Sequence, residues 1–185
     1  MELSDSKLIE ASPEAVWEAL LDPDVLKSCV PGCTEMTGSP EEGFEATVVQ
    51  KVGPVKATFK GAVTLSELDP GQGCVITGEG KGGPAGFAKG GARVRLEPVP
   101  EGTRLHYDVE AKVGGKLAQL GSRIIDGFAR KMAEQFFTCF KEKVEEPSET
   151  EGGTDAPSEG GTPTTKEGRQ GWLKGRFGKA EGGAG

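Results

Sequence analysis

Apolar and polar residues alternate along the middle of the chain. The period of two is clearest in residues 44–48, 55–65, 92–97 and 104–111, and breaks rich in glycine and proline separate these stretches at hairpin spacing. Because such alternation gives a strand one buried and one solvated face, it is typical of an antiparallel sheet. The pattern predicts a meander of about six strands, and a weaker alternation at residues 2–11 adds one more.

Helical signals stand on both sides of this region. Ser12 followed by Pro13 reads as an N-cap with proline at the first helical position, and Asp22 followed by Pro23 repeats the signal. Residues 116–144 then switch to a period of 3.6, which predicts one long helix with a broad apolar face. The elements are thus a strand, two short helices, an antiparallel meander and a long C-terminal helix.

The predicted fold class is therefore α+β. This order of elements describes the helix-grip fold, in which a curved sheet of about six to seven strands wraps the last helix and often leaves a hollow. Small residues at positions expected to point inward favour a hollow. They are Ala57, Gly61, Gly78 and Ala92 on the strands and Gly121 on the helix. The alternative is that Phe59, Phe87 and Phe128 fill the space.

Composition divides the chain near residue 146. Residues 147–185 contain 11 glycines and 3 prolines but only three large apolar side chains, too few to offset the entropy of ordering the backbone. They also hold five basic and six acidic residues, which leaves −6 of the net charge of −7 for residues 1–146. Residues 1–146 are the predicted folded domain, and an acidic domain argues against nucleic acid as a partner.

The end of the chain combines apolar and basic residues. Residues 147–170 are predicted to be a disordered linker that changes from acidic to basic, and residues 171–185 carry the stretch "GWLKGRFGK". A short helix would bring its apolar and basic side chains together on a membrane surface, although three glycines make that helix unstable in water. The predicted membrane-binding residues are Trp172, Leu173, Lys174, Arg176, Phe177 and Lys179. The alternative is an inert end.

Targeting signals and catalytic motifs are missing from the sequence. The N-terminus lacks the basic start and apolar run of a signal peptide, and no run approaches the ~20 apolar residues of a membrane-spanning helix. The sole histidine, His106, shares a strand face with charged residues, so we expect it outside the sheet and without a catalytic role. "GEGKGG" precedes no helix, which argues against dinucleotide binding.

The four cysteines fit a reducing cytoplasm better than a disulfide framework. Cys29 and Cys33 flank a Pro-Gly turn at a spacing that matches neither a redox motif nor, with one histidine in the chain, a zinc site. We expect buried thiols that act as small apolar groups, with a redox pair or a ligand contact as the alternatives. No metal site and no catalytic residue is predicted.

Three segments resemble the CoxG family, the G subunit of carbon monoxide dehydrogenase, which is a branch of the START/Bet v 1-like (SRPBCC) superfamily. They are "CVPGC", "KVGPVKATFKGAVTL" and "GGKLAQLGSRIIDGFARKMAEQFF", and the resemblance covers about residues 1–145. It implies a non-catalytic accessory protein that links a molybdenum carbon monoxide dehydrogenase to the inner face of the cell membrane. It also implies a respiratory quinone such as menaquinone as a non-covalent ligand.

Carried onto this chain, the resemblance places the ligand between sheet and helix. The expected lining residues, assigned by face, are Phe59, Phe87, Leu117, Leu120, Gly121, Ile124, Phe128 and Met132. Tyr107, the only inward-facing phenol, is the expected polar partner of a quinone headgroup. The alternatives are a docking or assembly factor for another molybdenum hydroxylase with no ligand in its cavity, and a small enzyme of the same superfold such as a cyclase.

Overall fold

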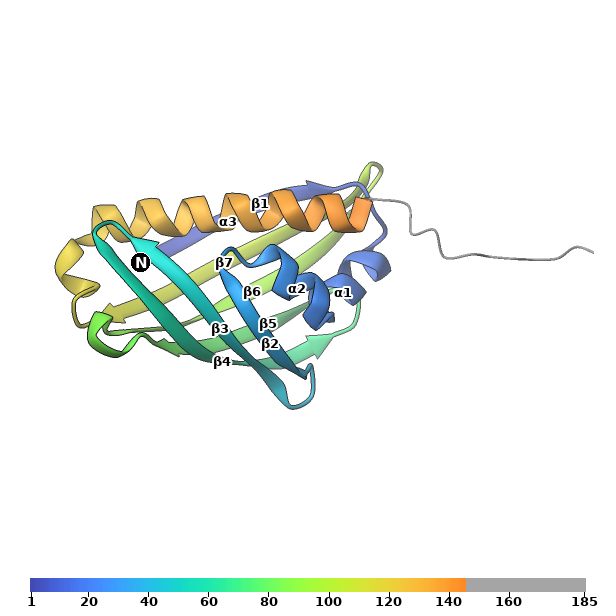
Figure 1. Cartoon of the computed structure of the whole chain (residues 1–185). Helices are drawn as coiled ribbons and strands as arrows, with labels where there is room; N and C mark the ends of the chain where they lie inside the picture. Colours follow the sequence, from blue (N-terminus) through green and yellow to red (C-terminus); the bar gives the residue numbers. More distant parts are fainter. Residues whose placement is uncertain (146–185) are drawn as a thin grey trace, which may run out of the picture. The chain divides into compact units, whose positions relative to one another are not determined.

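The computed structural model describes residues 1–145. The predicted linker at 147–170, the predicted membrane-binding end at 171–185 and the domain boundary at residue 146 therefore lie outside the described residues, and these stay predictions. Within residues 1–145 the chain forms one curved sheet and three α-helices, as Figure 1 shows.

All seven strands belong to one antiparallel sheet in the order β1-β7-β6-β5-β4-β3-β2. The strands are β1 (Glu2–Ile9), β2 (Cys33–Ser39), β3 (Gly43–Val52), β4 (Val55–Asp69), β5 (Gly73–Lys81), β6 (Phe87–Val99) and β7 (Gly102–Gly114). Strands β2 to β7 form the predicted meander, and β1 pairs with β7 from Glu2↔Glu110 to Ile9↔Thr103. The predicted α+β helix-grip fold is confirmed.

Two short helices follow β1, as predicted. Helix α1 (Pro13–Leu21) begins after Ser12, whose Oγ accepts a hydrogen bond from the Ala15 amide at 3.2 Å. Helix α2 (Pro23–Cys29) begins after Asp22, whose carboxylate accepts one from the Asp24 amide at 2.8 Å. In each case the proline occupies a position whose amide would have no helical partner, so the caps begin both helices cleanly.

The long helix starts later than the sequence suggests. Helix α3 (Ser122–Glu145) is preceded by a short 3-10 turn, η2 (Ala118–Leu120), and Gly121 separates the two with φ of 87°. Such a left-handed conformation is easy only for glycine. The prediction of one helix from residue 116 is therefore wrong, and Gly121 is a helix boundary instead of a small residue on the helix face. A second 3-10 turn, η1 (Gly83–Ala85), joins β5 and β6.

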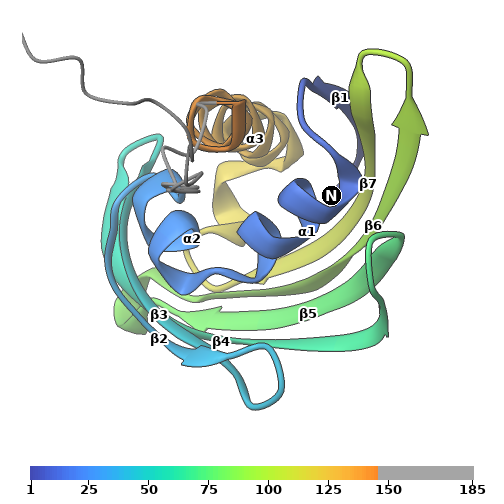
Figure 2. The same ribbon diagram turned by 90° about the vertical axis from the view of Figure 1, so that its right-hand side faces the viewer.

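The sheet curves around α3, and α1 and α2 lie within this curve beside the end of α3 (Figure 2). Two groups of buried residues hold these elements together. The larger group includes Ile9, Val16, Leu105, Phe137 and Phe140 and fastens α1 and the second half of α3 to the sheet. The smaller group contains only Val52, Leu117 and Ile125 and lies at the start of α3. The two ends of the fold are therefore unequally packed.

A disulfide joins Cys29 at the end of α2 to Cys139 on α3. The expectation of free thiols is wrong for these two residues, because α2 folds back against α3 and brings together cysteines 110 residues apart in the sequence. No spacing rule could reveal this pairing. Cys33 and Cys74 are free, and Cys74 is buried as expected.

Candidate ligand cavity

An apolar cavity of about 610 Å³ lies between the concave face of the sheet and α3. This volume falls in the range of sites that enclose a small organic molecule. The cavity exists because several inward positions carry small residues. Among them are Ala46, Gly80, Ala88 and Ala92 on the strands and Ala129 and Ala133 on α3. Phe59 and Phe128 lie on the wall of this cavity and do not fill it.

Five of the predicted lining residues lie on the cavity wall. They are Phe59, Tyr107, Leu117, Phe128 and Met132. Leu120 lies behind the wall, where it packs against the smaller buried group. The contact of any of these residues with a ligand stays a prediction.

Phe87, Gly121 and Ile124 are not on the wall. Phe87 is 44% exposed and Ile124 is 42% exposed. Phe87 is separated from Arg93 and Arg95 by an even number of positions on β6, so it points to the same outer face of the sheet. Its ring lies there against Gly114. Ile124 precedes the inward stripe of α3 that begins at Ile125, because the helix starts only at Ser122.

Gln50 is a polar cavity residue that is absent from the predicted lining. It lies on β3, where it faces inward with Phe44, Ala46 and Val52 because the four occupy alternate positions of the strand. Its amide nitrogen donates a hydrogen bond to the Pro31 carbonyl. The second hydrogen of this amide nitrogen remains as a donor, and the side-chain oxygen remains as an acceptor. The signal in the sequence was a polar residue on an otherwise apolar strand face.

The turn in "CVPGC" holds Gln50 in place. The Val49 amide donates a hydrogen bond to the Gly32 carbonyl at 2.8 Å, and any side chain at Gly32 would collide with the Val49 backbone. Glycine at this position therefore lets the turn approach β3 closely enough for Pro31 to accept from Gln50. This gives the motif a structural role at the cavity wall.

Tyr107 is the second polar side chain on the wall, and among the described lining residues only Gln50 and Tyr107 carry one. Its ring stacks on Phe137 with centroids 4.9 Å apart. Burial raises the pKa of Tyr107, and the nearby Asp5 carboxylate raises it further. The phenol is therefore protonated at neutral pH and can donate one hydrogen bond, either to the Asp5 carboxylate or to a carbonyl group.

His106 lies on the outer face of β7, as predicted. Its Nε2 is 2.8 Å from a carboxylate oxygen of Glu97, and this hydrogen bond lowers the pKa of Glu97. The side chain points away from the cavity, whose described lining holds no carboxylate, histidine or lysine side chain. Among the side chains of the described lining, only the Tyr107 hydroxyl could take part in proton transfer inside the cavity.

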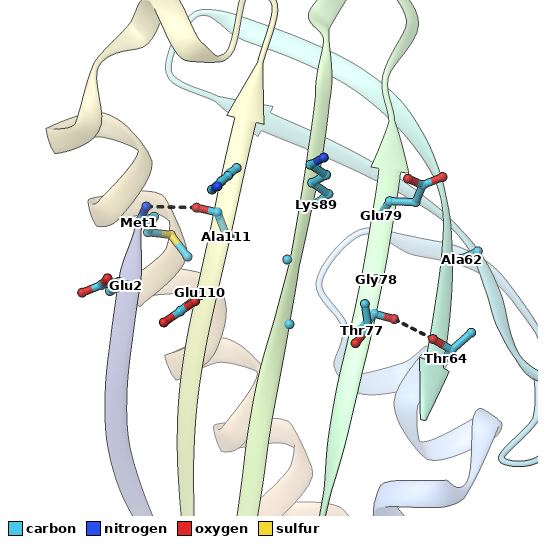
Figure 3. A pocket seen from close by; sticks show the side chains of 13 residues that line it. Met1, Glu2, Ala62, Thr64, Thr77, Gly78, Glu79, Lys89, Glu110 and Ala111 are labelled. Atoms are coloured by element: carbon cyan, nitrogen blue, oxygen red, sulfur yellow. Dashed lines mark hydrogen bonds between the residues drawn. The ribbon is translucent and has the colours of Figure 1, made fainter. Parts of the chain in front are cut away.

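A second pocket of about 610 Å³ lies on the outer face of the sheet (Figure 3). It is a shallow trough above positions that lack large side chains, such as Ala62, Gly78 and Gly91. Its rim carries charges of both signs, including Glu79, Lys89 and Glu110. A charged, open trough suits an apolar ligand far less well than the interior cavity does.

The family model for CoxG, the G subunit of carbon monoxide dehydrogenase, matches residues 6–145, which include every element from β1 to α3. The chain belongs to the CoxG family. Membership makes it a carbon monoxide dehydrogenase-associated protein, and the resemblance seen in the sequence is confirmed. No curated protein matches the sequence.

Solved structures share the CoxG-family fold described above. A conserved protein from Geobacillus kaustophilus is 27% identical with a TM-score of 0.73, over 78% of this chain and 95% of that one. A protein from Chromobacterium violaceum is 19% identical with a TM-score of 0.59, over 78% of this chain and 97% of that one. A protein from Thermus thermophilus is 15% identical with a TM-score of 0.60, over 80% of this chain and 99% of that one. The last two likenesses bear on the fold alone.

No helix among residues 1–145 is long and apolar enough to cross a membrane.

Proposed function

We propose that this CoxG-family chain binds a respiratory quinone of the menaquinone type, or a comparable lipid, in the interior cavity. The observation that carries the proposal is the composition of the wall, which is apolar except for Gln50 and Tyr107. A prenylated quinone has the same division, with a long apolar tail and two carbonyl groups. Tyr107 donates a hydrogen bond to one carbonyl, and the Gln50 amide offers a further polar contact.

The family and this cavity together support an accessory role. In the proposed role the protein is not an enzyme: it links the dehydrogenase to the cytoplasmic face of the cell membrane and accepts the quinone that receives the electrons. Residues 171–185 supply adhesion to the membrane through Trp172 and Phe177, with Lys174, Arg176 and Lys179 attracted to anionic headgroups.

Mass spectrometry of an organic extract tests the ligand directly. Full-length protein purified from its native host should yield a quinone or a lipid in stoichiometric amount, and the Gln50→Leu and Tyr107→Phe variants should yield less. An extract of the wild-type protein that contains neither compound would refute the carrier role. It would favour a docking or assembly factor with an empty cavity.

A further inference from the structure

The turns of the sheet segregate charge between the two ends of the fold. The β2–β3, β4–β5 and β6–β7 turns lie at the end where α3 finishes, and their acidic residues include Glu41, Asp69 and Glu101. The Glu145 carboxylate accepts a hydrogen bond from the Glu10 amide at 2.8 Å at this end. The β3–β4 and β5–β6 turns lie at the other end, beside the start of α3 (Figure 1).

That other end is basic although the domain as a whole is acidic. We call this surface the basic end. Its exposed cations are Lys51, Lys56, Lys81, Lys116 and Arg123. Within residues 1–145 only Lys81 of this set forms an ion pair, with Glu79 at 3.8 Å. Lys51 and Lys56 face each other across the β3–β4 ladder, and like charges directly opposite destabilise a strand pair. An anionic partner would relieve this repulsion.

Two large apolar side chains stand among these cations. Phe87 and Ile124 are exposed by 44% and 42%. Ile124 also lies near the tip of the β3–β4 turn, since a side chain on Gly53 would come within 3.5 Å of its Cγ2 atom. Phe87 pairs with Lys81 across the β5–β6 ladder, and Ile124 directly follows Arg123 in the chain. Exposed apolar groups beside lysine and arginine match the boundary between the acyl chains and the headgroups of an anionic bilayer.

The cavity wall behind the basic end is the thinner one. It is made by the smaller buried group of Val52, Leu117 and Ile125, whereas the opposite end is closed by the larger group and the α2–α3 disulfide. Opening the smaller group breaks fewer apolar contacts, so local opening costs less free energy there. A ligand that enters or leaves the cavity through this end therefore passes directly to the surface that the basic end contacts.

We propose that the basic end docks the folded domain on an anionic lipid bilayer, with Phe87 and Ile124 inserted among the acyl chains. Docking by the domain is independent of residues 171–185. The role of this contact in ligand exchange rests on the proposed function, but the contact itself does not.

Vesicle co-sedimentation tests the docking. The full-length protein carries alanine at every predicted membrane-binding position of the tail throughout, so that the binding attributed to the end of the chain is removed; these positions are Trp172, Leu173, Lys174, Arg176, Phe177 and Lys179. The vesicles contain phosphatidylcholine with or without phosphatidylglycerol. The variant Lys51→Ala/Lys116→Ala/Arg123→Ala should bind the anionic vesicles roughly 100-fold more weakly, at roughly fivefold for each cation. Raising the salt concentration should likewise weaken binding by the parent, which differs from the wild type only in the tail.

A matched variant removes the same number of positive charges at positions away from the basic end. Lys27→Ala/Arg104→Ala/Lys143→Ala also removes three exposed cations and should bind nearly as the parent does. Phe87→Ser with Ile124→Ser should weaken binding and leave its salt dependence unchanged. Equal binding by the two triple variants, or no preference for anionic vesicles, would overturn the proposal. Vesicle binding is measured independently of the quinone content of an extract. Failure of the docking proposal can therefore be distinguished from failure of the proposed quinone binding.

Discussion

Among single residues, Gln50 decides how polar the cavity wall is near the "CVPGC" turn. Replacing it with leucine keeps the volume but removes the amide that a quinone carbonyl, or a water bound to it, can reach. We expect Gln50→Leu to bind quinone about 5- to 10-fold more weakly, as for the loss of one hydrogen bond. The loss of the bond to Pro31 should also reduce the free energy of unfolding by about 1 kcal/mol.

Isothermal titration with a short-chain naphthoquinone measures the affinity, and thermal unfolding measures the stability. Gln135→Leu is the control, because Gln135 is exposed on α3. If Gln50→Leu and Gln135→Leu bind the quinone equally, Gln50 is not part of the site.

Tyr107 can be followed directly because it is the only tyrosine in the chain. Burial and the Asp5 carboxylate raise its pKa, so the absorbance change of ionisation in the near ultraviolet should occur above the ordinary value of 10.0. A raised pKa of an acid favours the protonated form in the folded state. This contribution to stability is complete below the unfolded pKa and is lost as the pH rises through the folded one. Bound quinone should move the transition to still higher pH.

Titration of Asp5→Asn separates the two causes of this shift. Removing the carboxylate should lower the pKa of Tyr107 part of the way, and burial should hold it above the ordinary value. A wild-type transition at or below the ordinary value would mean that the phenol is solvated and does not face the cavity.

Individual positions also show how far strand parity can be trusted. The parity of Arg93 and Arg95 already assigned Phe87 to the outer face, and the parity of Phe44 and Ala46 assigned Gln50 to the inner one. The sequence therefore contained both assignments, but they were obscured by the assumption that an aromatic residue is buried and an amide is exposed. Parity is the stronger criterion in a regular antiparallel sheet because the side-chain period is fixed at two.

Among the helices and strands, the disulfide between Cys29 and Cys139 fastens α2 to α3 by a covalent bond. It closes a loop of 110 residues, for which the loss of unfolded-chain entropy amounts to about 4–5 kcal/mol. Cys139→Ser should therefore lower the free energy of unfolding in urea by roughly that amount. Cys33→Ser should change it by less than about 1 kcal/mol, since Cys33 is free and only partly buried.

Alkylation of the unreduced, denatured protein provides the independent check on this bond. Two thiols, Cys33 and Cys74, should react before reduction and all four cysteines after it. If all four react at once and Cys139→Ser is as stable as the parent, the pairing of α2 with α3 does not form in solution.

The elements themselves were predictable wherever one local rule acted alone. Serine or aspartate followed by proline marked the starts of α1 and α2, and the period of two marked the strands. The start of α3 was missed because helical periodicity continues through Gly121, whereas the positive φ of this glycine ends η2 before α3 begins. Pairing of Cys29 with Cys139 likewise depends on tertiary approach, which no local pattern contains.

For the folded domain taken together, the architecture followed from the order of the elements, but the cavity did not. Whether a curved sheet and a helix enclose space depends on the summed side-chain volumes across the interface. Alanines at 88, 92, 129 and 133 prove small enough together to leave about 610 Å³ empty. The segregation of charge between the two ends of the fold could not be predicted from the sequence either. It becomes visible only when the structure shows which turns lie at which end of the sheet.

The proposed function requires that the apolar cavity, and no other surface, holds the quinone. Equilibrium binding of a menaquinone analogue to full-length protein, compared with Ala92→Phe and Ala62→Phe, measures this. Ala92 points into the cavity from β6, whereas Ala62 lies in the trough on the outer face. We expect saturable binding to the wild type and to Ala62→Phe, and binding to Ala92→Phe at least about tenfold weaker, a loss of about 1.4 kcal/mol. Unchanged binding by a folded Ala92→Phe variant, or no saturable binding to the wild type, would contradict the proposal.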